Sequence, residues 1–166
     1  MVKNALKCLL TYAAKGKVLN YPHDPGRAIM EKLQLKSLKP RHAILSGDPE
    51  CVSIEILITP FLWNQEIVNT SIRLDGIDLP SNMLRDLVGK SFEFPINPMD
   101  GYIDGSICIG EHHPVDVTSL SFNRSRDGDV SLVVKGVYEL DPSFDFFEQT
   151  GRIPFTMGTT VSSCAV

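Results

Sequence analysis

The sequence contains few cysteines and no long apolar run. Its four cysteines are separated from one another by more than forty positions, which excludes the short C-x-x-C spacings of zinc knuckles and redox sites. No apolar stretch approaches the roughly 18 residues of a transmembrane span. A P-loop, a dinucleotide-binding glycine pattern and a G-x-S-x-G nucleophile elbow are also missing. The sequence therefore offers no motif for phosphate binding or acyl transfer.

The N-terminus lacks the features of a secretory signal peptide. An apolar stretch covers residues 5–14, but Lys7 interrupts it and the charged Lys15-Gly16-Lys17 follows. A signal peptide needs an uninterrupted apolar region and a small-residue cleavage site. We therefore expect a cytoplasmic protein with reduced thiols and no membrane partner.

The composition is that of an ordinary folded domain, but the charge is unevenly distributed. The 166 residues are 43% hydrophobic and 22% charged, with a formal net charge of −4, which predicts a single domain over residues 1–166. Nine basic and two acidic residues precede position 43, whereas the rest of the chain holds seven basic and eighteen acidic residues. Either the basic segment packs on the acidic body, or each surface contacts a partner of opposite charge.

Hydrophobic periodicity predicts helices in the N-terminal part of the chain. Apolar residues recur at helical spacing over residues 3–15, and a second helix is expected over 26–35, ahead of Pro40. Further along, Ser81 can cap a short helix over 82–88. We therefore expect a basic helical segment over residues 1–42.

Beyond Asp48-Pro49 the apolar spacing becomes alternating, which is typical of strands. Asp75-Gly76 is a typical tight-turn sequence. Strands are expected over residues 52–59, 66–74, 77–79, 91–94, 102–109, 114–122, 130–140 and 153–157. These strands would form an acidic body over 50–158, followed by a flexible tail over 159–166. The expected fold class is α+β, with the N-terminal helices packed on a largely antiparallel sheet of about six or seven strands.

The most reactive cluster of side chains lies in a predicted hairpin loop. His112, His113 and Asp116 are the candidate catalytic residues, and the two histidines are also the candidate metal ligands, because imidazoles and carboxylates bind metals and transfer protons. Asp100 or Asp104 would support them in a small metal-dependent or acid/base hydrolase. Adjacent histidines usually point to different sides of the backbone. The alternative is a polar hairpin tip without chemistry.

A second candidate site combines aromatic and acidic residues after the strand over 130–140. Such residues either anchor the core or form a protein interface, in which aromatic rings supply contact area and carboxylates attract a basic partner. The candidate binding residues are Asp141, Phe144, Asp145, Phe146, Phe147 and Glu148.

These features favour a non-catalytic protein-binding domain whose acidic surface contacts a basic partner. A bacterial immunity or antitoxin-like protein is one concrete form, because carboxylates can mask the basic groove with which a nuclease holds phosphates. The hydrolase described above is the alternative. No cofactor is expected, and no nucleic-acid recognition module is evident. A third hypothesis is a homo-oligomer that pairs exposed sheet edges, for which the strand over 130–140 is the candidate.

Overall fold

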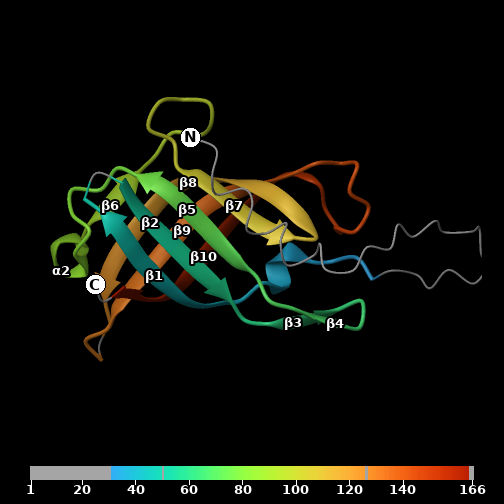
Figure 1. Cartoon of the computed structure of the whole chain (residues 1–166), viewed down its shortest axis with the longest axis horizontal. Helices are drawn as coiled ribbons and strands as arrows, with labels where there is room; N and C mark the ends of the chain where they lie inside the picture. Colours follow the sequence, from blue (N-terminus) through green and yellow to red (C-terminus); the bar gives the residue numbers. More distant parts are fainter. Residues whose placement is uncertain (1–30, 50, 126, 165–166) are drawn as a thin grey trace, which may run out of the picture. The chain divides into compact units, whose positions relative to one another are not determined.

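The structure is a computed structural model that describes residues 31–49, 51–125 and 127–164. Within these ranges almost all regular structure is strand (Figure 1). The two helical elements of these ranges are the 3-10 turn η1 (Leu35–Ser37) and the one-turn helix α2 (Leu84–Leu87). The strands are β1 (Pro40–Asp48), β2 (Cys51–Ile58), β3 (Phe61–Trp63), β4 (Glu66–Val68), β5 (Ser71–Ile77), β6 (Ser91–Glu93), β7 (Asp104–Ile109), β8 (Glu111–Arg124), β9 (Val130–Leu140) and β10 (Gly151–Ser163).

Seven of these strands close into a barrel. Their order is β8-β7-β5-β2-β1-β10-β9, and β9 pairs with β8 to complete the ring. All neighbours in the ring are antiparallel except β1 and β10, which are parallel. Strand β6 pairs with β8 outside the ring, and β3 and β4 form a separate two-stranded ribbon.

This architecture overturns the predicted α+β fold, because the strands close into a barrel and no N-terminal helices of the described residues pack on a sheet. The helix expected over 3–15 lies outside the described residues. The helix expected over 26–35 is described only from residue 31. Residues 31–34 are not helical, and the 3-10 turn η1 begins at Leu35. Alternating apolar residues indicate strands, but they do not specify which strand edges meet, and closure depends on the long-range pair β1–β10.

Two boundaries also differ from the sequence prediction. At Asp75-Gly76 the chain makes a bulge instead of a turn, because the register against β2 shifts there and Gly76 has a φ of 70°. Strand β5 therefore continues to Ile77, where the sequence predicts a new strand. The predicted tail over 159–166 is strand as far as Ser163, because it pairs with β1 and β9.

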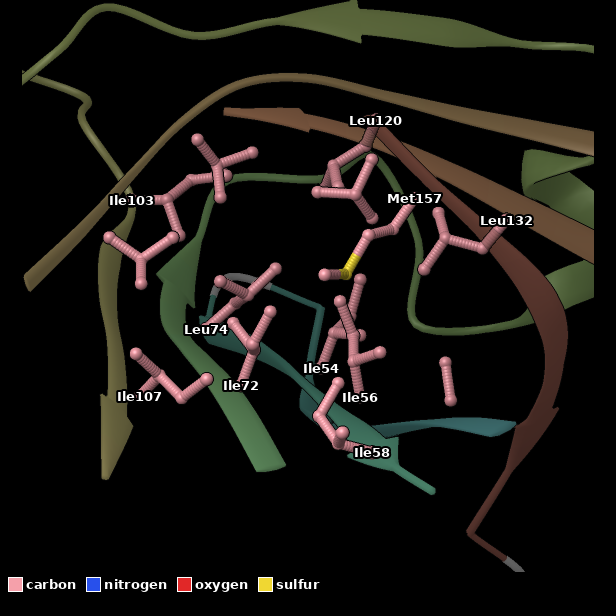
Figure 2. Packing of buried hydrophobic residues seen from close by; sticks show 14 of the residues in the cluster. Ile54, Ile56, Ile58, Ile72, Leu74, Ile103, Ile107, Leu120, Leu132 and Met157 are labelled. Carbon is pink, nitrogen blue, oxygen red and sulfur yellow. The ribbon is translucent and has the colours of Figure 1, made fainter. Parts of the chain in front are cut away.

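The barrel interior is filled by aliphatic side chains, as expected for a ring of this size. On β2, alternate residues from Val52 to Ile58 are at most 3% exposed. Figure 2 shows how side chains from opposite walls point toward one another across the interior. The labelled members of this core are Ile54, Ile56, Ile58, Ile72, Leu74, Ile103, Ile107, Leu120, Leu132 and Met157.

The two ends of the barrel are covered by different segments. Near one end lies α2, whose Leu87 is fully buried. At the other end the loop over 141–150 is bound to the segment that precedes η1: Leu33 N donates to Phe146 O at 2.8 Å, and Glu148 N donates to Leu33 O at 3.0 Å. The β3–β4 ribbon extends from this second end (Figure 1).

Candidate functional site

The structure separates the three residues predicted for catalysis. On β8, His113 lies on the same side as the buried Val115 and is 1% exposed. His112 and Asp116 lie on the opposite side of the strand, because side chains alternate; His112 is exposed and Asp116 is 6% exposed. Among the described residues, no group of three His, Cys, Asp or Glu side chains is placed to hold a metal ion.

His113 belongs to an aromatic cluster that covers one end of the barrel. Its ring makes edge-to-face contacts with Phe144, Phe146 and Phe147, at centroid distances of 5.3, 6.0 and 4.9 Å. Trp63 joins the cluster at 5.6 Å from Phe146. We call these five residues the aromatic plug. The three phenylalanines therefore pack against the core. Core packing is one of the two roles that the sequence suggests for them, and a protein interface is the other.

Burial lowers the pKa of His113, although the hydrogen bond with Ile109 O and the charge of Glu111 act in the opposite direction. The Nε2 atom lies 3.3 Å from Ile109 O. The folded protein therefore favours the neutral imidazole. A buried neutral imidazole surrounded by phenylalanine rings is a packing element of the plug.

Acidification should destabilise the protein through His113. Between about pH 7.5 and about pH 5.5 the unfolded histidine takes up a proton that the folded His113 resists, so the free energy of unfolding falls as the pH falls. Urea denaturation at both pH values measures the loss. We expect a smaller loss in His113→Phe than in the wild type. Equal losses in wild type and His113→Phe would contradict this account.

Asp116 participates in an ion network on the outside of the barrel. Its Oδ2 atom lies 3.6 Å from Arg152 Nη2, and its Oδ1 atom accepts a hydrogen bond of 3.3 Å from Asn97 N. Glu139 pairs with the same guanidinium group. These contacts join β8, β9 and β10 to the loop that precedes β7. Asp100 of that loop and Asp104 at the start of β7 are exposed.

The acidic residues of the second candidate site face solvent. Asp141, Asp145 and Glu148 are exposed, whereas the neighbouring phenylalanines are half-buried or buried. Lys32 Nζ donates to Asp145 Oδ1 at 2.6 Å. This ion pair joins the segment that precedes η1 to the loop over 141–150. Asp141 and Glu148 present their carboxylates on the same loop.

The barrel also contains a cleft that the sequence analysis missed. Strands β1 and β10 pair only from Ala43↔Val161 to Leu45↔Ser163, whereas β10 pairs with β9 over residues 151–160. Among the described residues, the first part of β10 therefore has a strand partner on one edge only. Between this edge and the segment over 35–40 lies a cleft of about 340 Å³, which we call the seam cleft.

The walls of the seam cleft are mostly apolar. Lys36 is the only charged residue among the lining residues that the structure describes. The volume and the sparse polar groups match the usual properties of small-molecule sites. The lining residues are Leu35, Lys36, Leu38, Pro40, Tyr138, Ile153, Pro154, Phe155, Thr156, Met157 and Gly158.

Tyr138 lines the seam cleft and carries a buried hydroxyl group. The residue is 1% exposed, and its ring stacks on Phe155 at a centroid distance of 4.5 Å. Its hydroxyl lies 4.0 Å from Met157 Sδ, and a thioether is a weak acceptor. Burial raises the pKa of Tyr138. The phenol therefore stays neutral and able to donate a hydrogen bond.

The free edge of β10 adds backbone donors to the cleft. Cys164 N donates to Leu45 O across the seam at 2.8 Å. Because backbone groups alternate along a strand, Thr156 and Gly158 direct their N–H groups to the same side. Pro154 shares this orientation but has no N–H, and proline in a strand is typical of an unpaired edge. Pro154 is the one local sign of the cleft in the sequence.

Comparison with known proteins identifies no relative of this chain. No helix of the described residues is long and apolar enough to cross a membrane. No protein-family model, curated protein or solved structure matches this chain.

Proposed function

We propose that this chain is a non-catalytic binding protein whose barrel holds a small apolar ligand in the seam cleft. The observation that carries the proposal is the Tyr138 hydroxyl, a buried donor with the sulfur of Met157 as its contact at 4.0 Å. Buried hydroxyl groups usually have a full hydrogen-bond partner. An oxygen of a ligand in the seam cleft would provide one.

The apolar walls determine the chemical character of the rest of the ligand. Ile153 and Phe155 of β10 line the cleft together with Leu35 and Leu38. Each Å² of apolar surface that a ligand removes from water contributes about 25 cal/mol. A chain of several carbons would therefore provide most of the affinity, and one oxygen at Tyr138 would fix its orientation.

Octan-2-one tests the proposal because it is neutral, apolar and carries one carbonyl acceptor. We expect it to bind the wild-type protein, and we expect Tyr138→Phe to weaken binding about two- to tenfold, since a hydrogen bond contributes about 0.5–1.5 kcal/mol. Calorimetric titration measures both affinities. Tyr102→Phe is the control, because Tyr102 does not line the cleft, and its affinity should equal that of the wild type.

Two outcomes would count against the proposal. Absence of binding to the wild-type protein would refute a cleft that holds small apolar ligands. Equal affinities in wild type and Tyr138→Phe would remove the role of the hydroxyl, which is the observation on which the proposal depends. The circular dichroism spectrum of each variant checks that the barrel is retained.

A protein partner with a basic surface, as in an immunity or antitoxin-like role, stays a prediction of the charge distribution. Its contact surface would include the exposed carboxylates of Asp141 and Glu148, since Asp145 already binds Lys32. Self-association through β9 is not supported, because β9 pairs with β8 on one edge and with β10 on the other. A hydrolase needs convergent side chains, and His112 and His113 lie on opposite sides of β8.

A further inference from the structure

Lys36 is an uncompensated charge at the seam cleft. The residue is exposed, and no carboxylate appears among the residues that line the cleft. Within the described residues the ion pairs involve Lys32, Arg85 and Arg152, and none of them involves Lys36. Glu148 borders a smaller hollow next to Lys36 without pairing with it. In the part of the chain that the structure describes, the lining of the cleft therefore carries one positive charge and no acidic group.

Two kinds of donor lie along the same opening. The Lys36 ammonium group comes from η1, and the N–H groups of Thr156 and Gly158 come from the free edge of β10. Hydrogen bonds from such donors to a carboxylate are stronger than those between neutral groups. An anionic head group in the cleft would thus have an opposite charge and backbone donors among the lining residues.

We propose that the natural ligand of the seam cleft is an apolar carboxylate. Its carboxylate binds Lys36, and its carbon chain lies against Phe155 and Met157. A second oxygen further along the chain, as in an oxo or hydroxy acid, accepts the hydrogen bond of the Tyr138 hydroxyl. This inference rests on the proposed function, because it names the chemical class of ligand for the same cleft.

The size of the cleft limits the length of the chain. Small-molecule pockets generally range from about 300 to about 1,000 Å³, and the seam cleft, at about 340 Å³, is near the lower limit. A carboxylate of medium chain length therefore fits better than a long-chain lipid. Aliphatic acids and aryl-substituted acids share this chemistry. The affinities of the protein for octanoate and for 4-phenylbutanoate distinguish these two classes of ligand.

Octanoate and octan-1-ol test the carboxylate, because they have equal chain lengths and differ in the head group. We expect octanoate to bind the full chain about two- to fivefold more tightly at low ionic strength, the range of a single solvent-exposed ion pair. The preference should disappear in Lys36→Ala, reverse in Lys36→Glu and decrease with added salt. Lys90→Ala is the control, because Lys90 is an exposed lysine that does not line the cleft.

The outcomes separate this inference from the proposed function. If octanoate and octan-1-ol bind the wild-type protein with equal affinity, the inference that the ligand carries a carboxylate is refuted. A neutral apolar ligand is then favoured. If the preference for octanoate survives in Lys36→Ala, Lys36 is not the binding group. If neither these probes nor octan-2-one bind, the proposed function fails, and the inference fails with it.

Discussion

Replacement of Phe147 by alanine is expected to lower the free energy of unfolding by about 3–5 kcal/mol, the usual cost of truncating a buried phenylalanine. Phe147 is 2% exposed, and its ring lies 4.9 Å from His113 and 4.5 Å from Phe146. The substitution would leave a cavity next to a buried imidazole. Urea denaturation, followed by the fluorescence of Trp63 in the same plug, measures the loss.

Phe147→Leu is the matched control for this substitution. Leucine keeps most of the apolar volume, so we expect a loss below about 1.5 kcal/mol. If Phe147→Ala costs less than about 1 kcal/mol, the plug does not stabilise the barrel. The phenylalanines would then be better explained as the protein interface that the sequence offers as the other possibility.

Gly136→Ala is expected to destabilise the barrel by about 1–3 kcal/mol, as is typical of overpacked sites. A Cβ atom at this position would lie 2.6 Å from the backbone oxygen of Asp116 and 2.9 Å from the ring of Phe155. The ring lies opposite Gly136 on the neighbouring strand. Because Phe155 lines the seam cleft, its displacement should also weaken the binding of octan-2-one.

Gly158→Ala is the control for Gly136→Ala. Gly158 lies on β10, and the nearest atom to an added Cβ is a methyl group of Val133 at 3.9 Å. We therefore expect its free energy of unfolding to stay within about 0.5 kcal/mol of the wild type. Equal stabilities of the two variants in urea would show that the contact between Phe155 and the backbone at position 136 does not restrict this position.

The strands with regular alternation could be predicted from the sequence, because burial of one face leaves a local pattern. The predicted strands over 52–59 and 130–140 correspond to β2 and β9. Strand β1 was missed, because Pro40 reads as the end of a helical region and polar residues soon follow it. The end of β10 was assigned to a tail, since its serines and threonines lack an alternating apolar pattern.

Barrel closure and the seam cleft could not be predicted from local patterns. Closure requires β1 to lie beside β10, and these strands are distant in the sequence. The cleft combines Leu35, Tyr138 and Phe155, each of which reads alone as an ordinary core residue. His112 and His113 show the opposite case. They are adjacent in the sequence, but the alternation of side chains along β8 places them on opposite faces of the strand.

The position of octan-2-one on the barrel shows whether the seam cleft is a ligand site. Amide chemical-shift changes in an NMR titration of the full chain give this position. We expect the largest changes at Leu38 and Tyr138 and along residues 156–158, which line the cleft. Changes that are absent, or that are concentrated at the aromatic plug or around α2, would contradict a ligand site in the cleft.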